Sequence, residues 1–580
     1  MSAQRQTSFQ KITENGAFDV VVIGGGINGL GVYRELSLQG LRVLLVERND
    51  FCSGCSAAPS RMIHGGLRYL ENGEVDLVRE SLAERDALLA NAPHMVRPLP
   101  TTIPITSWFS GLFNSAATFI GKTGKPSNRG VLPVKIGLAL YDRITGKRSA
   151  LPRHQFRGAS ATLKTWPRLT RKLLCSATYH DAWISYPERL GVELILDTAQ
   201  EVPTSVALNY SELLPANTDV ADAFEVEDRE TGARYAVSTR VLVNASGAWL
   251  DQVNAQIAPT KEAVKPLVSG TKGSHLIINN GDLFEALNGH MLYFENTDGR
   301  VCIVFPYLGN VLAGSTDIRV QHVARTRCSK DERDYILGSL QLIFPDILIN
   351  RDNIVFSFSG IRPLPISDHD FTGRISRNHK VHRIDGPVPQ FCMIGGKWTT
   401  FRAFSEQTTD AVLQELGLAR LKDTKQLPIG GGKDFPNEAD VLATRLMEDF
   451  GISRQRADYL TDVYGTRARL VIGACQQGSN DEPLVSGLNL TAAEIIWLVE
   501  NEHVEHLADL IFRRTSLAIA GHVTTTVIEE IAAIMATHLN WSPQRLEQEG
   551  QFVLDDLRDY HGVSLEDLRH RAITRSKECA

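Results

Sequence analysis

The stretch Asp19-Val20-Val21-Val22-Ile23-Gly24-Gly25-Gly26-Ile27-Asn28-Gly29 decides the fold of this chain. Its β-branched run is typical of a strand buried on both faces, and a helical pattern follows the glycines. Gly24, Gly26 and Gly29 have the G-x-G-x-x-G spacing of a dinucleotide-binding turn. There the first glycine permits the bend, the second lets a pyrophosphate approach the backbone, and the third lets helix and strand pack closely. The phosphates would lie on unpaired N–H groups at the helix start.

The residues after this turn indicate which dinucleotide binds. A second expected strand, Arg42 to Val46, ends at Glu47, whose carboxylate can accept hydrogen bonds from the ribose hydroxyls of an adenosine. The same carboxylate would repel a 2′-phosphate, so FAD or NAD is favoured over NADP. A purely structural glycine turn is the alternative, but the order of strand, helix, strand and acid argues against it.

Length and composition describe an ordinary globular protein. The 580 residues are 43% hydrophobic and 22% charged with a formal net charge of −6, which gives no reason to expect a nucleic-acid partner. The length suggests about three or four domains. Eight cysteines in so long a chain do not indicate a disulfide framework, so a reducing compartment is expected. Residues 1–17 are polar, and no apolar run reaches the ~18 residues of a spanning helix. The protein is therefore expected to be soluble or to lie on a membrane.

Two motifs follow the second strand. Cys52 and Cys55 form a C-x-x-C pair, which suits either thiol or metal chemistry or small residues beside a cofactor. Because the sequence has no second C-x-x-C pair, we favour the interpretation that Cys52 and Cys55 are small loop residues beside a cofactor. We expect no metal site. Next, the segment from Arg61 to Leu70 contains His64, Gly65, Gly66, Arg68 and Tyr69. Its glycines allow a ligand to approach the backbone, while the histidine offers a base and the arginine an anion clamp. The alternative is a satisfied histidine and a surface arginine.

These residues begin a series of motifs in which the chain resembles the FAD-dependent (aerobic, respiratory) glycerol-3-phosphate dehydrogenases, a branch of the FAD oxidoreductases related to amino-acid oxidases. The resemblance covers nearly the whole chain in the family's order. Its motifs are 63–70 (I-H-G-G-L-R-Y-L), 136–142 (I-G-L-A-L-Y-D), 272–275 (K-G-S-H), 314–317 (G-S-T-D), 359–363 (S-G-I-R-P) and 395–402 (G-G-K-W-T-T-F-R).

Two segments depart from the family pattern: the loop before the histidine, and residues 108–130, which look like an insertion. The family loop before the histidine is typically G-T-S-S-R-S-S-K, whereas residues 54–61 of this chain are G-C-S-A-A-P-S-R. Pro59 has no N–H to donate, which leaves the flavin contacts of this loop open.

The expected fold is an α/β Rossmann-like FAD-binding domain, interleaved with an antiparallel-sheet substrate domain of the amino-acid-oxidase type and followed by a C-terminal helical domain. The discontinuous FAD-binding domain comprises 19–105, 165–260 and 356–428, the substrate or cap domain 106–164 and 261–355, and the helical domain 433–580. In the last we expect helices over 438–450, 454–464, 492–501, 509–518 and 524–539, whose charges form solvated faces and interdomain pairs.

The resemblance implies the site. Removing the hydroxyl proton of a secondary alcohol suits a histidine, whose unperturbed pKa is ~6.5, and a phosphate suits arginines. We expect the catalytic residues to be His64, Arg68, Arg362 and Lys397, with substrate contacts from Tyr69, His275 and Arg377. Contacts with FAD are expected from Gly24, Gly25, Gly26, Ile27, Asn28, Gly29, Glu47, Cys55, Ser56, Gly65, Gly66, Val206, Ser246, Gly247, Gly396 and Thr399. The helix opening at Thr399 would direct its N-terminus at the flavin ring.

The expected reaction is oxidation of glycerol 3-phosphate to dihydroxyacetone phosphate, with electrons passed to a membrane quinone. An oxidase that uses oxygen, a dehydrogenase of a longer polyol phosphate and a non-catalytic flavin-binding homologue are alternatives, and a homodimer is possible. Residues 108–121 carry four aromatic residues beside lysines. This composition suits an element lying in a membrane interface, which would dock the protein on the cytoplasmic face of the cell membrane. An insertion folded over the protein's own core is the alternative.

Overall fold

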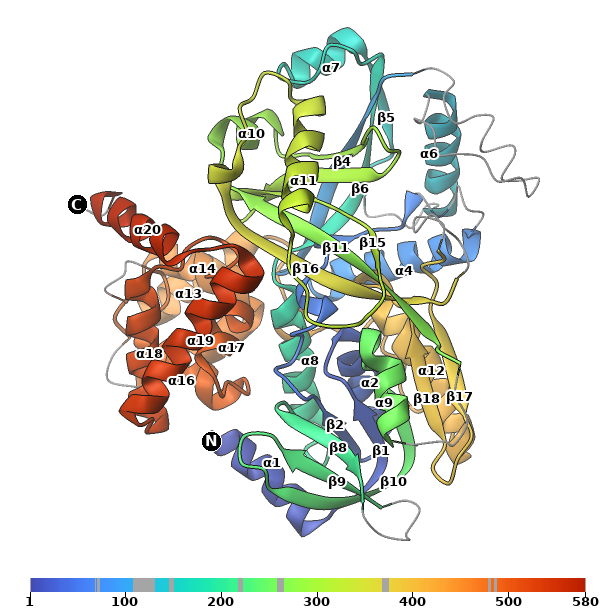
Figure 1. Ribbon diagram of the computed structural model, residues 1–580, viewed down its shortest axis with the longest axis vertical. Helices are drawn as coiled ribbons and strands as arrows, with labels where there is room; N and C mark the ends of the chain where they lie inside the picture. Colours follow the sequence, from blue (N-terminus) through green and yellow to red (C-terminus); the bar gives the residue numbers. More distant parts are fainter. Residues whose placement is uncertain are drawn as a thin grey trace.

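The computed structural model describes residues 2–67, 69, 74–107, 131–145, 151–216, 223–257, 265–367, 375–477, 481–484 and 488–578. Two β-sheets lie one above the other in Figure 1, and the C-terminal helices form a group of their own beside them. This is the expected α/β architecture of an FAD-binding sheet, a substrate sheet and a helical region.

The first sheet is built around the strand that opens the sequence. In the described residues its order is β17-β18-β10-β1-β2-β7, with β9 and β8 continuing from β10. The pairs from β18 to β7 are parallel, whereas β17 and the β8–β9 hairpin are antiparallel. The strands are β1 (Ala17–Ile23), β2 (Val43–Val46), β7 (Val206–Leu208), β8 (Ser211–Pro215), β9 (Ala223–Asp228), β10 (Arg234–Asn244), β17 (Lys380–Ile384) and β18 (Gln390–Ile394).

Both faces of the first sheet are covered. Val20 and Val22 face a core made with α2 (Ile27–Ser37), α8 (Pro187–Glu201) and α12 (Phe401–Leu416). The alternate residues of β1 face a core that includes Phe9 of α1 (Ala3–Glu14). This is why the strand is apolar without alternation.

The second sheet has the order β15-β11-β14-β13-β12-β4-β6-β3 in the described residues, with β16 beside β11 and β5 beside β6. It is antiparallel as expected, apart from the parallel pair β12–β4. The strands are β3 (Met62–Ile63), β4 (Val96–Ile105), β5 (Gln155–Gly158), β6 (Cys175–Ile184), β11 (Val268–Ile278), β12 (Met291–Glu295), β13 (Val301–Tyr307), β14 (Asn310–Gly314), β15 (Ile318–Val320) and β16 (Ile354–Pro365).

By pairing, β4, β6 and β16 belong to this second sheet, although the sequence ranges assign most of their residues to the FAD-binding domain. Pairing within a sheet does not by itself define domain boundaries, so the division of the chain into domains at the residue ranges given above stays a prediction. The remaining helices of this part are α4 (Val75–Asn91), α6 (Val131–Thr145), α7 (Ala159–Thr165), α9 (Leu250–Ile257), α10 (Gly281–Ala286) and α11 (Lys330–Ile343).

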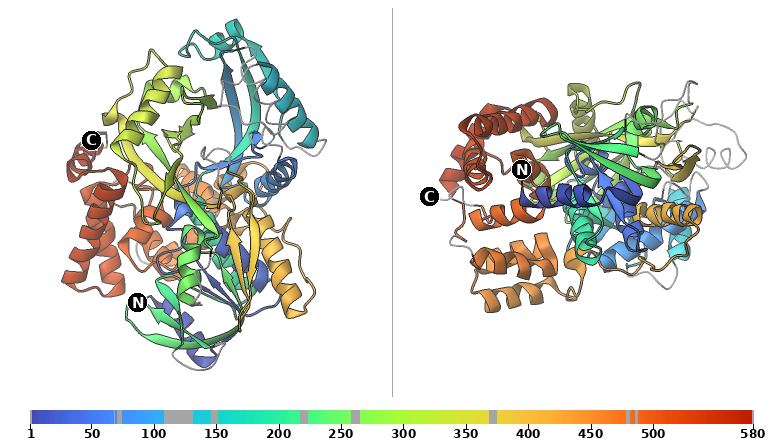
Figure 2. Two further views of the ribbon diagram at one scale, coloured as in Figure 1. Left: turned by 45° about the vertical axis from the view of Figure 1, so that its right-hand side comes forward. Right: turned by 90° about the horizontal axis from the view of Figure 1, so that it is seen from below.

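The C-terminal helices form a group on one side of the two sheets (Figures 1 and 2) and share a hydrophobic core with residues of the second sheet, such as Phe356 and Phe358. They are α13 (Ala439–Phe450), α14 (Arg454–Tyr464), α15 (Ala468–Gln477), α16 (Ala492–Asn501), α17 (Leu507–Asp509), α18 (Thr525–Leu539), α19 (Pro543–His561) and α20 (Leu565–Glu578). The helix expected over 509–518 is wrong, because Leu510–Arg514 form a π-helical turn and extended backbone follows at Thr515.

Buried ion pairs join this region to the sheets. Arg514 donates to both carboxylate oxygens of Asp50, and Arg189 of α8 pairs with Glu502 at 2.9 Å. The interdomain pairs expected from the charge pattern are therefore present and buried. Among the described helices, none combines the length and the apolar character needed to span a bilayer.

Candidate active site

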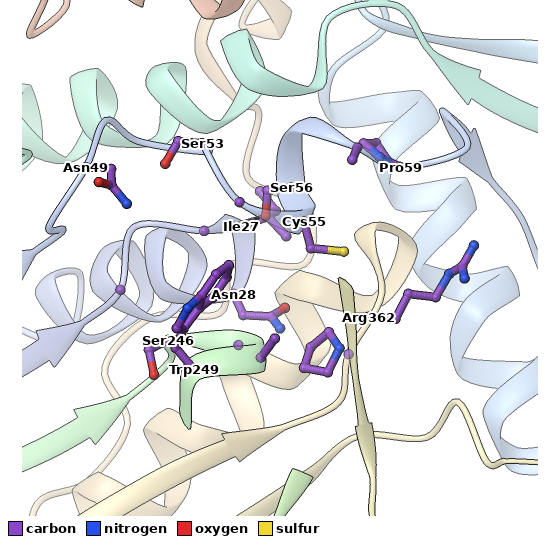
Figure 3. Close-up of a pocket in the computed structure, with 18 of the residues that line it drawn as sticks. Ile27, Asn28, Asn49, Ser53, Cys55, Ser56, Pro59, Ser246, Trp249 and Arg362 are labelled. Carbon is purple, nitrogen blue, oxygen red and sulfur yellow. Dashed lines mark hydrogen bonds between the residues drawn. The ribbon is translucent and has the colours of Figure 1, made fainter. Parts of the chain in front are cut away.

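One cavity of about 1250 Å³ lies where the two sheets and the C-terminal helices meet. It is lined by the glycine turn after β1, the loop after β2, the end of β10, the ends of β16 and β18, and residues of α19. Figure 3 shows Asn28, the adjacent Cys55 and Ser56, and Arg362 around this space, so three segments of the chain meet there.

The glycine turn has the geometry that its spacing predicts. Gly24 has a φ of +106°, which favours glycine. A Cβ on Gly29 would lie 1.8 Å from the carbonyl oxygen of Gly24, so the close approach of helix and strand requires glycine there. Gly24 and Gly26 line the cavity together with Ile27 and Asn28.

Glu47 also lines the cavity, and its carboxylate holds backbone N–H groups. The N–H of Gly25 donates to Oε2 at 2.7 Å and the N–H of Asn49 donates to Oε1 at 2.8 Å. Burial raises the pKa of Glu47, although these two hydrogen bonds oppose the shift. The acid therefore fixes the glycine turn and the following loop, and its contact with a ribose stays a prediction.

The loop after β2 is tied to the same turn. The N–H of Ile27 donates to Oγ of Ser56 at 2.9 Å, and Nε1 of Trp398 donates to the carbonyl oxygen of Ser56 at 3.2 Å. Cys52 is buried and Cys55 is part-buried, and both are free thiols. Burial raises the pKa of both thiols, which disfavours the thiolate form needed for thiol chemistry. That the two cysteines serve as small residues of a cofactor loop stays a prediction.

The glycine turn and its neighbours fit a bound dinucleotide. Nδ2 of Asn28 donates to the carbonyl oxygen of Gly395 at 3.2 Å, while its buried Oδ1 has no hydrogen-bond partner in the described part of the chain. Gly247 and Gly396, with φ of +63° and +96°, line the cavity beside Ser246 and Thr399. An unsatisfied buried oxygen beside exposed backbone is what a ligand would complete.

His64 lies in the segment that follows β3, at the junction of the two sheets. Its own N–H donates to Oγ1 of Thr399 at 3.2 Å, and the next N–H, of Gly65, donates to Oδ1 of Asp181 at 3.1 Å. Burial, with help from the charge of Lys397, lowers the pKa of the imidazole to about 4. The ring is therefore neutral at physiological pH and able to accept a proton.

Asp181 was not identified from the sequence. Its Oδ1 accepts hydrogen bonds from Tyr141 at 2.6 Å and from Arg85 at 3.0 Å, in addition to Gly65. All three side chains are buried. Asp181 thereby fixes the backbone beside His64, but nothing in its local sequence, within a buried strand, indicates that role.

Lys397 follows the end of β18 and lines the same cavity as His64. Its Nζ donates to Oγ of Ser81 at 2.7 Å and lies 4.5 Å from the ring centroid of Tyr69. Burial lowers the pKa of Lys397 to about 7, although Glu80 and Glu74 oppose this shift. The ammonium therefore titrates near neutrality.

A cationic end of the cavity is formed by Arg362 and Arg377. Each donates to Asp317 at 3.2 Å, one to Oδ1 and the other to Oδ2. His275 lies nearby, stacked on Phe358 with ring centroids 5.0 Å apart. Its two ring nitrogens are buried without hydrogen-bond partners among the described residues, so this ring has donor and acceptor capacity left for a ligand.

The structure thus gathers most of the predicted site. The predicted residues that line the cavity are Gly24, Gly26, Ile27, Asn28, Glu47, Cys55, Ser56, His64, Gly66, Tyr69, Ser246, Gly247, His275, Arg362, Arg377, Gly396, Lys397 and Thr399. Four of the predicted residues that the structure describes are not among those that line the cavity: Gly25, Gly29 and Gly65, which pack closely against neighbouring residues, and Val206, which is buried in β7. Arg68 lies outside the described residues. Trp249 and Asn49, which were not predicted, also line the cavity.

Comparisons with known proteins agree with this geometry. A family model described as FAD dependent oxidoreductase matches residues 19–396, and one described as the C-terminal domain of alpha-glycerophosphate oxidase matches residues 422–546. The fold and the cavity are accordingly those of an FAD-dependent oxidoreductase, and FAD is the cofactor.

Individual relatives indicate which family of FAD-dependent oxidoreductases the chain belongs to. A glycerol-3-phosphate dehydrogenase of Synechocystis sp. is 32% identical over 93% of this chain and 96% of its own length. The mitochondrial glycerol-3-phosphate dehydrogenase of Mus musculus is 29% identical over 94% of this chain and 74% of its own length. The X-ray structure of glycerol-3-phosphate dehydrogenase from Bacillus halodurans complexed with FAD has the same fold, with a TM-score of 0.74 at 23% identity over 96% of this chain and 98% of that one. The chain belongs to the FAD-dependent glycerol-3-phosphate dehydrogenase family.

Proposed function

We propose that this protein oxidises glycerol 3-phosphate to dihydroxyacetone phosphate and passes the electrons to a membrane quinone. The observation that carries the proposal is the meeting in one cavity of a dinucleotide turn, a neutral histidine and a pair of arginines. A base beside a cofactor suits oxidation of an alcohol, and two guanidinium groups suit a phosphate. The names of the relatives agree with this substrate.

FAD, when bound, supplies the acceptor for the two electrons and the carbon-bound hydrogen that leave the substrate. The chain's own residues would do the rest. His64 would accept the proton of the secondary hydroxyl, and Lys397 would hold the substrate oxygen or offset negative charge. Arg362 and Arg377 would bind the phosphate and so place the hydroxyl near His64. The Gly24–Gly29 turn and the Asn49–Ser60 loop would hold the dinucleotide.

Bleaching of the bound flavin under anaerobic conditions tests the substrate. Glycerol 3-phosphate should reduce the flavin rapidly, whereas unphosphorylated glycerol and longer polyol phosphates should act poorly. No bleaching by any of these would instead favour a non-catalytic flavin-binding homologue. Comparing oxygen consumption with and without a quinone analogue then separates a quinone-dependent dehydrogenase from an oxidase.

The exposed face of α6 supports the membrane part of the proposal. Leu132, Ile136 and Leu140 are 42%, 58% and 41% exposed, and their spacing of four places them on one side of the helix. Lys135 and Arg143 on the same helix are exposed. Aliphatic residues beside cations suit a lipid surface with anionic headgroups. The segment 108–121, in which docking was first expected, lies outside the described residues.

Changing Leu132, Ile136 and Leu140 together to asparagine should release the protein from membrane vesicles. Activity with a soluble dye should remain, while activity with membrane quinone should fall, because the carrier is dissolved in lipid. In a matched control, Leu342 and Leu348 are changed to asparagine. These residues are 45% and 81% exposed and lie outside α6, so the control should stay bound to the vesicles. If the α6 variant still sediments with vesicles containing anionic lipid, this face is not the docking surface.

The titration of Lys397 gives a pH prediction. Its pKa is lowered to about 7 by burial, so the ammonium is charged below and neutral above that pH. The kcat/KM for glycerol 3-phosphate should therefore fall as the pH rises through about 7. Lys397→Arg should keep its charge and retain kcat/KM up to pH ~9, since an arginine has a pKa above ~12. An unchanged alkaline limb in this variant would assign the titration to another group.

A further inference from the structure

The hydroxyl of Tyr141 lies against the backbone of the segment that carries His64. Tyr141 is on α6, which lies beside β6 and α4 (Figure 1). Its hydroxyl donates to Oδ1 of Asp181 on β6 at 2.6 Å, and the same oxygen accepts from the N–H of Gly65 at 3.1 Å. A Cβ on Gly65 would lie 2.3 Å from the hydroxyl oxygen of Tyr141, so this approach requires glycine. One carboxylate oxygen therefore joins α6 to the residue after His64.

These hydrogen bonds are shielded from water. Tyr141 and Asp181 are 2% and 1% exposed, and Arg85 of α4 donates to the same oxygen of Asp181 at 3.0 Å. Burial, together with the charge of Asp181, raises the pKa of Tyr141, so the hydroxyl keeps its proton and acts as a donor. A hydrogen bond to a charged acceptor is stronger than one between neutral groups. The contact between α6 and Asp181 is therefore well fixed.

The apolar face of α6 packs along the same segment. Val134, Leu138 and Tyr141 are spaced as one face of a helix, and all three belong to a buried cluster with Leu67 and Tyr69. These last two residues follow the proposed base closely in the chain. Close-packed side chains leave little room for the segment to shift. Helix α6 therefore supports both the backbone beside the base and the residues that follow it.

The imidazole of His64 depends on its backbone for its position. Among the described residues its ring makes no hydrogen bond, and an aromatic neighbour, Tyr69, lies with its ring centroid 6.0 Å away. The backbone is held instead, by the bond from the N–H of His64 to Thr399 and by the bond from the N–H of Gly65 to Asp181. A base must lie within hydrogen-bond reach of the proton that it removes, and a misplacement of about 1 Å can cost about 10²-fold in rate. Residues that anchor this backbone should therefore affect the rate.

We propose that Tyr141 is a positioning residue that places the imidazole of His64 by holding Asp181 against the neighbouring backbone N–H. The inference deepens the proposed function and rests on it, because His64 is the base there. Tyr141 is not among the described residues that line the cavity, so it acts through the loop and not by contact with substrate or FAD. Its loss should slow removal of the proton but leave phosphate binding unchanged, since the two arginines of the cationic end belong to other segments.

Anaerobic reduction of the bound flavin by glycerol 3-phosphate tests the proposal in the FAD-loaded protein. In Tyr141→Phe, which removes only the hydroxyl, the limiting rate at saturating substrate should fall about tenfold. The substrate concentration that gives half of this rate should change by less than about twofold. Tyr464→Phe is the matched control. Its hydroxyl donates to the buried Glu494 at the same 2.6 Å, in the C-terminal helices, and its loss should leave the rate unchanged.

A second comparison shows whether Tyr141 acts through His64. Residues that act as a unit have strongly non-additive effects on rate. Adding Tyr141→Phe to His64→Ala should therefore slow reduction by less than about twofold, because the group that Tyr141 positions is already absent. An equal loss of rate in both backgrounds would overturn the proposal, since it would assign Tyr141 a general structural role.

The remaining outcomes are distinct. An unchanged limiting rate in Tyr141→Phe would also overturn the proposal, even though the parent protein is reduced by glycerol 3-phosphate. No bleaching of the parent protein, or unimpaired bleaching in His64→Ala, would instead refute the proposed function. If Tyr141→Phe fails to fold or to retain FAD, Asp181→Asn weakens the same acceptor and is compared in both backgrounds. It should show the same non-additive loss, and an equal loss in both would again overturn the proposal.

Discussion

Replacing His64 by alanine should slow reduction of the bound flavin by glycerol 3-phosphate by about 10²- to 10⁴-fold, the usual effect of losing a general base. FAD should remain bound, because among the described residues the side chain of His64 makes no hydrogen bond to the glycine turn or to the loop after β2. Rapid-mixing absorbance under anaerobic conditions measures this rate directly. His538→Ala, in the C-terminal helix α18, is a matched control and should leave the rate unchanged.

The pH dependence of the same reaction sharpens this prediction. The pKa of His64 is lowered to about 4 by burial and by Lys397, so the imidazole becomes protonated, and unable to accept a proton, only near that pH. The acid limb of kcat/KM should therefore lie near pH 4, well below the ~6.5 of an unperturbed histidine. Rapid bleaching in His64→Ala would show that another group removes the proton.

The first sheet could be predicted because its signals are local. A β-branched run, a glycine spacing and an acid after the next strand require no knowledge of distant residues. The structure only lengthens the first strand to Ala17, where it pairs with Ser238 of β10. Membership of β4, β6 and β16 in the second sheet could not be predicted in this way, because it depends on pairing between segments far apart in the chain.

Other elements were missed for the same physical reason. Helix α1 has a polar sequence and is stabilised by distant partners, since Phe9 and Ile12 pack under the first sheet and Arg5 pairs with Asp228 at 2.5 Å. The π-helical turn at Leu510–Arg514 replaces the expected helix, and Arg513 and Arg514 within it both reach Asp50. Tertiary contacts decide these conformations, and a local pattern does not contain them.

In the candidate site, too, some residues could be identified from local motifs, whereas the roles of others depend on distant contacts. Residues that would contact ligands, such as His64 and Arg362, belong to motifs and were identified by their chemical type. Asp317 lies within a quoted motif, but its role depends on two arginines from other segments. Asp181 acts through the backbone of Gly65. Supporting residues are found only when their partners are known.

Asp50 connects the cofactor loop to the C-terminal helices. Its carboxylate accepts from Arg514 at 2.7 and 2.8 Å and from Arg513, with all three groups largely buried. Burial alone would raise the pKa of Asp50, but the two guanidinium groups hold it well below its usual range. The ion pairs of Asp50 with the two arginines therefore stabilise the fold at neutral pH, and this contribution is lost only in strong acid, where the carboxylate becomes protonated. The same loop is tied to the glycine turn, where the N–H of Cys52 donates to the carbonyl oxygen of Gly25 at 2.9 Å.

Asp50→Ala should consequently affect stability and cofactor binding together. Two buried arginines would lose their counter-charge, which should lower the free energy of unfolding by about 3–5 kcal/mol, and the loosened loop should weaken FAD binding at least about tenfold. Denaturant unfolding and fluorescence of released FAD measure the two effects. Asp334→Ala, at an exposed pair, should cost no more than about 1 kcal/mol. The double variant Asp50→Ala/Arg514→Met should recover part of the stability, because it removes one of the uncompensated charges. If Asp50→Ala unfolds like the parent protein and retains FAD equally well, the C-terminal helices do not support the cofactor loop through this contact.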